Sequence, residues 1–102
     1  MMEYRVEWSG KSVADLSGHI AFLKRVSEDS ARALLASVIS KGDSLAQFPE
    51  RCPEFPMPVN FPVTVRKCVV DGRYIILFGV YESVVMIFRI LNARKKFDGL
   101  LE

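Results

Sequence analysis

The sequence has a single histidine, two cysteines and no glycine-rich phosphate-binding motif. Cys52 and Cys68 lack the CxxC spacing of zinc and redox sites, and no Cys/His cluster accompanies them. Metal, nucleotide and flavin sites therefore have no support, and we expect no cofactor. We expect both cysteines to be structural, because a reducing compartment disfavours a disulfide. His19 lies in a mostly apolar stripe, where histidine is usually a packed side chain rather than a catalytic base.

Long apolar runs are also missing. The longest, residues 74–91, is interrupted by Gly79, Glu82, Ser83 and Arg89, whereas a membrane-spanning helix needs roughly 18 apolar residues. The N-terminus has no basic region followed by an apolar run, which is the pattern of a secretory signal. We therefore expect a cytoplasmic protein with no membrane role.

Neither sign of charge dominates the chain. Lysine and arginine number 14 against 12 aspartate and glutamate, which gives a net charge of +2. A protein that coats nucleic acid is usually far more basic, so any contact with a polyanion must come from local clusters. Half of the 102 residues are hydrophobic, which is typical of one compact domain, and we assign residues 1–102 to it.

The first half of the chain predicts a strand and two helices. Residues 4–8 alternate apolar and charged side chains, as a half-buried strand does. Apolar residues then recur at helical spacing over residues 12–26, and Ser12 with Asp15 resembles a capping box. Residues 27–30 offer new caps before a second apolar stripe, which contains Ala31, Leu34, Leu35, Val38 and Ile39.

The second half predicts an irregular connector and three strands. All five prolines fall within residues 49–62, where they exclude both helix and central strand. Residues 63–70, 74–81 and 84–91 are rich in β-branched and aromatic side chains, and Asp71-Gly72 is a strong hairpin signal.

This order predicts an α+β fold, in which an N-terminal strand and an antiparallel helical hairpin precede a three-stranded antiparallel meander. The helices should cover one face of the sheet, with the first strand joining the meander as a neighbour or an edge. Strand alternation could place Arg66 and Arg89 together on the open face. The alternative is that both are solvated or paired with Glu3, Glu7 or Glu82.

Several short segments occur in a characteristic order along nearly the whole chain. They are Tyr4–Ser9, Asp15-Leu16, Leu45–Glu50, Arg66 within residues 65–67, Tyr74–Phe78 and Ile90–Lys95. In this order the sequence resembles the RelE/ParE superfamily of toxins from type II toxin–antitoxin systems. The resemblance implies the same α+β architecture. It also implies a neighbouring antitoxin whose C-terminal segment wraps the toxin.

The resemblance implies one of two activities, because RelE-like members are ribosome-dependent mRNA endoribonucleases and ParE-like members bind and inhibit DNA gyrase. Arg66 and Arg94 match family arginines, and Tyr81 is a candidate acid or stacking residue if the chain is a nuclease. No lysine pair precedes Arg66, although Lys67 and Lys95 are possible substitutes. Lys67 should point into the helices or an edge, because it alternates to the face opposite Arg66.

The family ending His-Gly-Arg-Arg is also changed, since Asn92 and Ala93 take its first two places and Lys95 its last. A site with cations but no proton acceptor can bind phosphate without cutting it. The sequence therefore favours a ParE-like, non-enzymatic gyrase inhibitor. The alternatives are a RelE-like nuclease and an inactive homologue that only binds its antitoxin.

Partner binding requires exposed apolar or charged surface. The candidates for binding the target or the antitoxin are Phe55, Met57, Phe61, Arg89, Lys95, Lys96, Phe97 and Leu100. An edge strand at residues 4–8 could accept an added antitoxin strand. We expect a homodimer or a toxin–antitoxin hetero-oligomer. A small domain that only mediates oligomerisation would explain the composition but not the ordered motifs.

Overall fold

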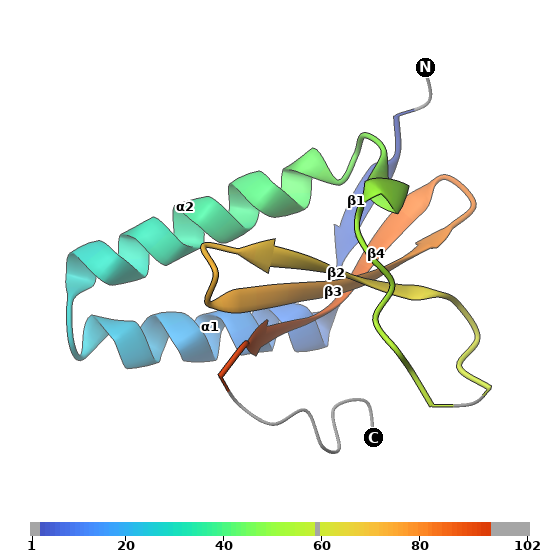
Figure 1. Cartoon of the computed structure of the whole chain (residues 1–102). Coiled ribbons are helices and arrows are strands. Elements are labelled where there is room, and N and C mark those ends of the chain that lie inside the picture. The colour runs from blue at the N-terminus through green and yellow to red at the C-terminus, as the bar shows by residue number, and fades with distance from the viewer. Residues whose placement is uncertain (1–2, 59, 95–102) are drawn as a thin grey trace.

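The structure, a computed structural model, describes residues 3–58 and 60–94 and consists of one sheet with a helical hairpin (Figure 1). Its elements follow the predicted order of strand, two helices and three strands. They are β1 (Arg5–Trp8), α1 (Gly10–Lys24), α2 (Glu28–Ser44), the 3-10 turn η1 (Pro49–Arg51), β2 (Val65–Val70), β3 (Tyr74–Tyr81) and β4 (Val84–Asn92).

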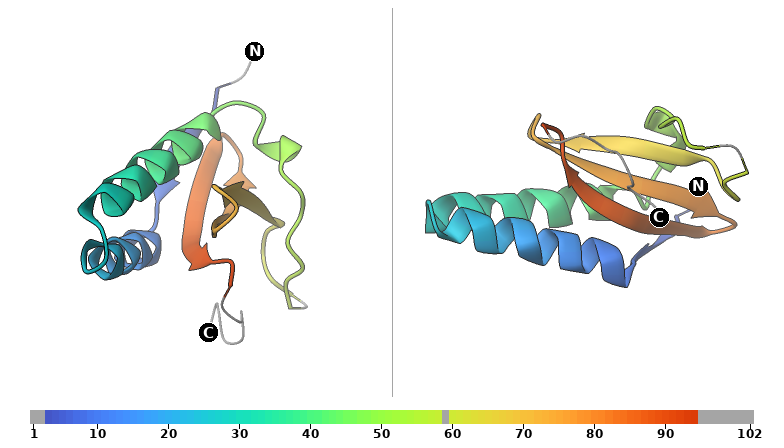
Figure 2. Two further views of the ribbon diagram at one scale, coloured as in Figure 1. Left: turned by 60° about the vertical axis from the view of Figure 1, so that its left-hand side comes forward. Right: turned by 90° about the horizontal axis from the view of Figure 1, so that it is seen from below.

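The sheet has the strand order β1-β4-β3-β2. Strands β2, β3 and β4 form the predicted antiparallel meander, and β1 runs parallel to β4 at the edge, with Arg5 opposite Val84. Both helices lie on the same face of the sheet, as the two views of Figure 2 show. The α+β architecture predicted from the sequence is therefore confirmed.

The β2–β3 hairpin follows directly from its turn sequence. Asp71 and Gly72 both have positive φ angles, 52° and 68°, as the two central residues of a type I′ turn require. The Arg73 amide closes this turn by donating to the Val70 carbonyl at 3.1 Å. Arg73 is a third loop residue, because Val70 pairs with Tyr74. Strand β3 has the bounds predicted from the sequence.

The two helices begin at serine caps, and the first cap differs from the predicted one. Ser9, not Ser12, caps α1, because its hydroxyl accepts the Ser12 amide at 3.0 Å. Ser12 itself is buried in the first turn, where its hydroxyl donates to the Ser9 carbonyl. Helix α2 begins after Ser27, whose hydroxyl accepts the Ser30 amide at 3.1 Å.

The main core lies between the helices and the sheet. It combines Leu16, Leu34 and Val38 from the helices with the helix-facing residues of the strands, which are Cys68, Val70, Tyr74, Ile76, Phe78, Val85, Ile87 and Ile90. The predicted apolar stripes are wider than this core. Phe22, Val26, Leu35 and Ile39 are exposed, because each helix contacts the sheet along one side only.

The proline-rich connector runs along the outer edge of β2 before it crosses the sheet. The Phe55 amide donates to the Val65 carbonyl at 2.8 Å, and the Lys67 amide donates to the Pro53 carbonyl at 3.0 Å. The sheet face opposite the helices, the helix-free face, is therefore partly covered rather than open as predicted (Figure 2). The connector takes this path because an extended, proline-containing segment can still pair along an edge.

Within residues 3–58 and 60–94, neither helix has the length and apolarity needed to cross a membrane. The same residues contain no group of three or more histidine, cysteine, aspartate or glutamate side chains that could hold a metal ion.

Candidate functional site

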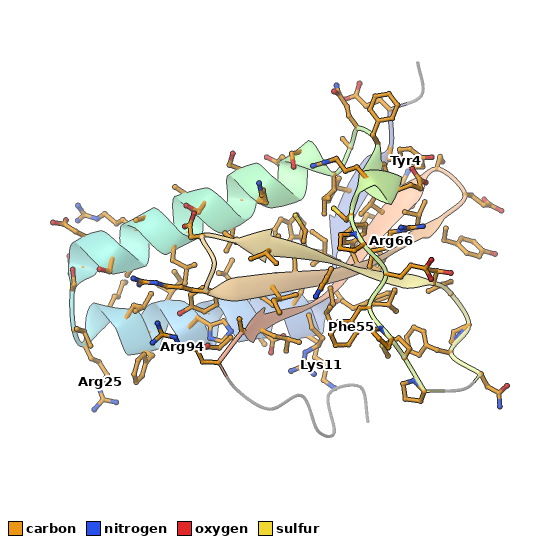
Figure 3. All side chains as sticks on the ribbon, in the orientation of Figure 1. Tyr4, Lys11, Arg25, Phe55, Arg66 and Arg94 are labelled. Atoms are coloured by element: carbon orange, nitrogen blue, oxygen red, sulfur yellow. The ribbon has the colours of Figure 1, made fainter. Side chains whose placement is uncertain are left out.

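The helix-free face carries the apolar residues predicted to bind a partner. Phe55, Met57 and Phe61 come from the connector and are half-buried. They pack on a small cluster formed by strand residues Val65, Ile75, Leu77, Phe88 and Leu91. The structure thus brings these three predicted residues together, and Figure 3 shows Phe55 where the connector crosses the sheet.

Beside this cluster lies an apolar hollow of about 440 Å³. Its lining, almost wholly apolar at the surface, consists of Glu7, Phe61, Pro62, Val63, Gly79, Tyr81, Val84, Met86 and Phe88. A Cβ at Gly79 would lie 3.0 Å from both Phe88 and Val63, so the glycine allows the connector to approach the sheet. An exposed hollow of this kind is a common docking site for apolar side chains.

The hollow opens next to the edge strand β1. Glu7 of β1 lines it, and β1 is the outermost strand of the sheet. Among the described strands, none pairs with the outer edge of β1, whereas the outer edge of β2 is covered by residues 53–55. An unpaired strand edge beside an apolar hollow can take up an extended peptide by strand addition.

The sequence suggested that Arg66 could lie on the helix-free face, but the structure places it on the other face of the sheet. It shares a strand face with Cys68 and Val70, which both lie in the core beneath the helices. Its guanidinium turns to the edge and donates to the carbonyls of Cys52 at 2.7 Å and Glu50 at 3.3 Å. Figure 3 shows Arg66 beside the connector.

Lys67 accordingly projects to the helix-free side, whereas the prediction placed it towards the helices or an edge. Its partner across the β2–β3 pair is Leu77, which belongs to the cluster on the helix-free face.

The Arg89 side chain is held by Asp15 of α1. The partners considered from the sequence were instead the glutamates 3, 7 and 82. The Arg89 guanidinium donates to both Asp15 carboxylate oxygens, at 2.7 and 3.0 Å, and the Ile90 amide donates to the same carboxylate at 3.0 Å. The hydrogen bonds that Arg89 donates to Asp15 raise the pKa of Arg89 above its ordinary value. This pair fastens α1 to β4.

A β-bulge changes the strand alternation of β4 just before Arg89. The β3–β4 register shifts between Leu77 and Phe78, so that Phe88 is an extra residue in β4. Beyond the bulge, Ile90 enters the core beneath the helices and Leu91 joins the helix-free face. Alternation without a bulge would give Leu91 the same face as Val85 and Ile87, which lie in the core beneath the helices. With the bulge, Arg89 pairs with Leu77, which belongs to the helix-free face, so strand pairing does not place Arg89 on the face of Arg66.

The three candidate catalytic residues do not converge. Tyr81 is at one end of β3, whereas Arg94 follows Asn92, which pairs with Tyr74 at the other end. Seven strand residues separate these ends by about 23 Å. Arg66 lies near the connector and Arg94 at the far end of β4 (Figure 3). Lys95, Lys96, Phe97 and Leu100, also predicted to bind partners, lie outside the described residues.

His19 is half-buried and packed, as the sequence analysis expected. Its Nε2 lies 2.8 Å from the Ile90 carbonyl, and its ring meets Tyr74 edge-on with centroids 4.9 Å apart.

A second exposed apolar set was not identified from the sequence, which placed most of its members in the apolar stripes of the two helices. It consists of Val13, Phe22, Val26, Leu35, Ile39 and Phe48. The exposure of these residues could have been predicted from the width of the apolar stripes on the helices, because one sheet cannot cover stripes this wide. Phe48 also has a left-handed backbone, with φ at 48°.

Most of the chain matches known proteins in sequence and in fold. The family model described as the ParE toxin of the type II toxin–antitoxin system parDE matches residues 6–97. The toxin RelE2 of Caulobacter vibrioides is 29% identical over 91 residues, which cover 89% of this chain and 97% of that protein.

Two solved structures share the fold at low sequence identity. A structure described as the chromosomal ParDE toxin–antitoxin system from P. aeruginosa matches with a TM-score of 0.71 and 18% identity, covering 90% of this chain and 98% of that one. The toxin–antitoxin complex RelBE2 from Mycobacterium tuberculosis matches with a TM-score of 0.61 and 17% identity, covering 88% and 98%. Because the family model spans residues 6–97, this chain belongs to the ParE toxin family of type II toxin–antitoxin systems.

Proposed function

We propose that this chain is a ParE-like toxin that inhibits DNA gyrase by binding it, and that a cognate antitoxin neutralises the toxin. The observation that carries the proposal is the separation of the candidate catalytic groups, together with the match to the ParE family model. Inhibition by binding needs a complementary surface, whereas nuclease activity needs several groups around one phosphate.

RNA cleavage requires its catalytic groups to lie close together, so the distance between the candidate residues counts against a nuclease. Attack by a ribose 2′-hydroxyl needs a base, a cation near the phosphate and an acid for the leaving oxygen, all within hydrogen-bond reach. Arg66 already donates to two backbone carbonyls. Tyr81 and Arg94 belong to opposite ends of β3. This arrangement supports binding over cleavage.

The antitoxin proposal draws on the surface of the helix-free face. An extended antitoxin segment would add a strand to the outer edge of β1 and place apolar side chains in the adjacent hollow. A basic antitoxin side chain would meet Glu7 at the rim of that hollow. Such a partner is supported by the two solved structures with this fold, which are described as a ParDE toxin–antitoxin system and a RelBE2 toxin–antitoxin complex.

A RelE-like, ribosome-dependent endoribonuclease is the second candidate function. The similarity to a relative named toxin RelE2 favours it, since that similarity extends over 89% of the chain. An inactive homologue that only binds its antitoxin is the third candidate.

Cell-free translation separates these functions. Purified protein is added to the reaction, and primer extension maps new 5′ ends on the messenger RNA. We expect intact message. Ribosome-dependent cuts that disappear in Arg94→Ala, a change at an exposed side chain, would overturn the proposal in favour of a nuclease. Intact message without gyrase inhibition would leave the inactive homologue.

The antitoxin surface is tested by calorimetry on two matched variants with exposed positions. Tyr81→Glu adds a charge at the rim of the hollow, where the residue is 65% exposed, and Val26→Glu adds one at a 76% exposed position on the helical hairpin. We expect Tyr81→Glu to weaken antitoxin binding by about tenfold or more and Val26→Glu to leave it unchanged. The reverse pattern would place the antitoxin on the hairpin.

A further inference from the structure

Cys52 and Cys68, far apart in sequence, lie opposite each other across the edge pairing of the connector and β2. Residues 53–55 pair antiparallel with residues 65–67, with Glu54 opposite Arg66. One further step in this register places Cys52 opposite Cys68, and Cys52 has an extended backbone with φ at −83° and ψ at 140°. Both side chains belong to the core beneath the helices.

The hydrogen-bond pattern makes this pair of positions a close one. The bonds join residue 55 to residue 65 and residue 67 to residue 53, so the 54/66 and 52/68 pairs are non-hydrogen-bonded. In such pairs the Cα atoms are about 4.5 Å apart and the side chains approach closely. A disulfide requires Cα atoms about 4.4 to 6.8 Å apart, so the backbone geometry suits one.

Both cysteines are free thiols and nearly buried, at 7% and 6% exposure. Burial and the neighbouring Cys52 thiol raise the pKa of Cys68 to about 11, against the opposing effect of the Lys41 and Arg51 charges. The contribution of Cys52 to this shift agrees with the register, which places the two residues opposite each other. The raised pKa also keeps Cys68 protonated at neutral pH.

We propose that Cys52 and Cys68 are a redox modification site, which a small-molecule disulfide such as oxidised glutathione converts into an intramolecular disulfide. One cysteine thiolate attacks the oxidant, forms a mixed disulfide and releases one small thiol. The other cysteine attacks the protein sulfur of the mixed disulfide and releases the second small thiol. Two cysteine thiols are oxidised, one small disulfide is reduced, and the two cysteine protons end on the two released thiols.

The disulfide would fasten the connector at the edge of β2 and close a loop from Cys52 to Cys68. This loop contains Phe55, Met57 and Phe61, which cover the helix-free face, and it supplies one wall of the apolar hollow. Oxidation therefore limits how far the connector can separate from the sheet. The inference does not depend on gyrase or on any other target.

The test uses the full chain, incubated at pH 8.5 with oxidised glutathione, alkylated and digested with trypsin. We expect a cross-link between the tryptic peptides Cys52–Arg66 and Cys68–Arg73, in monomeric protein. Thermal unfolding should move up by about 5 °C or more and return after dithiothreitol, because the cross-link restricts the unfolded chain.

Cys52→Ala and Cys68→Ala are the matched controls, and oxidant should leave the thermal midpoint of each unchanged. The peptide map of the unaltered chain decides the question even if a variant fails to fold. A glutathione adduct on one cysteine without the cross-link would overturn the proposal. So would a cross-link found only between molecules, or thiols that react only after the protein is denatured.

Discussion

The contact between Asp15 and Arg89 predicts a large stability loss on substitution. Two guanidinium bonds and one backbone amide bond converge on the Asp15 carboxylate, and the two side chains are only 16% and 17% exposed. Asp15→Ala leaves Arg89 nearly buried without this carboxylate and removes the acceptor of the Ile90 amide. Breaking a buried pair costs about 3–5 kcal/mol, and partial exposure lowers our expectation to about 2–3 kcal/mol.

Urea unfolding followed by circular dichroism measures this loss, and the thermal midpoint should fall by about 10 °C or more. Asp15→Ala, Arg89→Ala and the double variant form a cycle in which we expect a coupling energy of about 1 kcal/mol or more. The control is Glu28→Ala, which breaks an exposed pair with Arg32 and should change stability by less than about 0.5 kcal/mol. A loss of equally small size for Asp15→Ala would refute the reasoning.

Three further predictions concern packing, capping and pH. Gly42→Ala should destabilise the fold by about 1–3 kcal/mol in urea unfolding, because a Cβ would overlap the Trp8 ring, whereas Gly18→Ala, with open space around it, should be neutral or stabilising. Ser9→Ala should cost about 1–2 kcal/mol in the same assay, because its hydroxyl caps α1 and donates to a β4 carbonyl; an unchanged midpoint would contradict this role. The raised pKa of Cys68 means that its folded thiol keeps its proton after the unfolded thiol has lost it, so stability falls as pH rises through about 9 to 11. Between neutral pH and pH 10.5, the unaltered chain should lose about 2 kcal/mol more of its free energy of unfolding than the Cys68→Ala variant loses. Equal pH profiles for the two proteins would contradict this prediction.

The sequence predicted the fold well because its signals are local. Alternation, helical spacing and the Asp71-Gly72 turn each act within a few residues, and β3 has the predicted bounds. The choice between Ser9 and Ser12 as the cap depended on where β1 ends, and two serines three residues apart give similar signals. The strand order was predicted only in part, because the sequence left β1 as a neighbour or an edge of the meander, and the structure places it at the edge beside β4.

The candidate site was predicted less well, since it depends on contacts between distant segments. The bulge at Phe88 changes the alternation of β4, and no local pattern signals it. The partner of Arg89 lies 74 residues away, on another element. The pairing of Cys52 with Cys68 similarly arises from the path of the connector along β2.

The face on which Arg66 lies could have been predicted from its neighbours in β2. Cys68 and Val70 share its parity, and their apolar character indicates the covered face of the sheet.

A supercoiling assay is the most direct test of our proposal that this toxin inhibits DNA gyrase by binding. Relaxed plasmid, gyrase and ATP are incubated with increasing amounts of the purified chain, with and without its antitoxin. We expect supercoiling to fall as the toxin-to-gyrase ratio rises and to return when antitoxin is added. Full supercoiling at every ratio, with ribosome-dependent message cleavage by the same preparation, would contradict it.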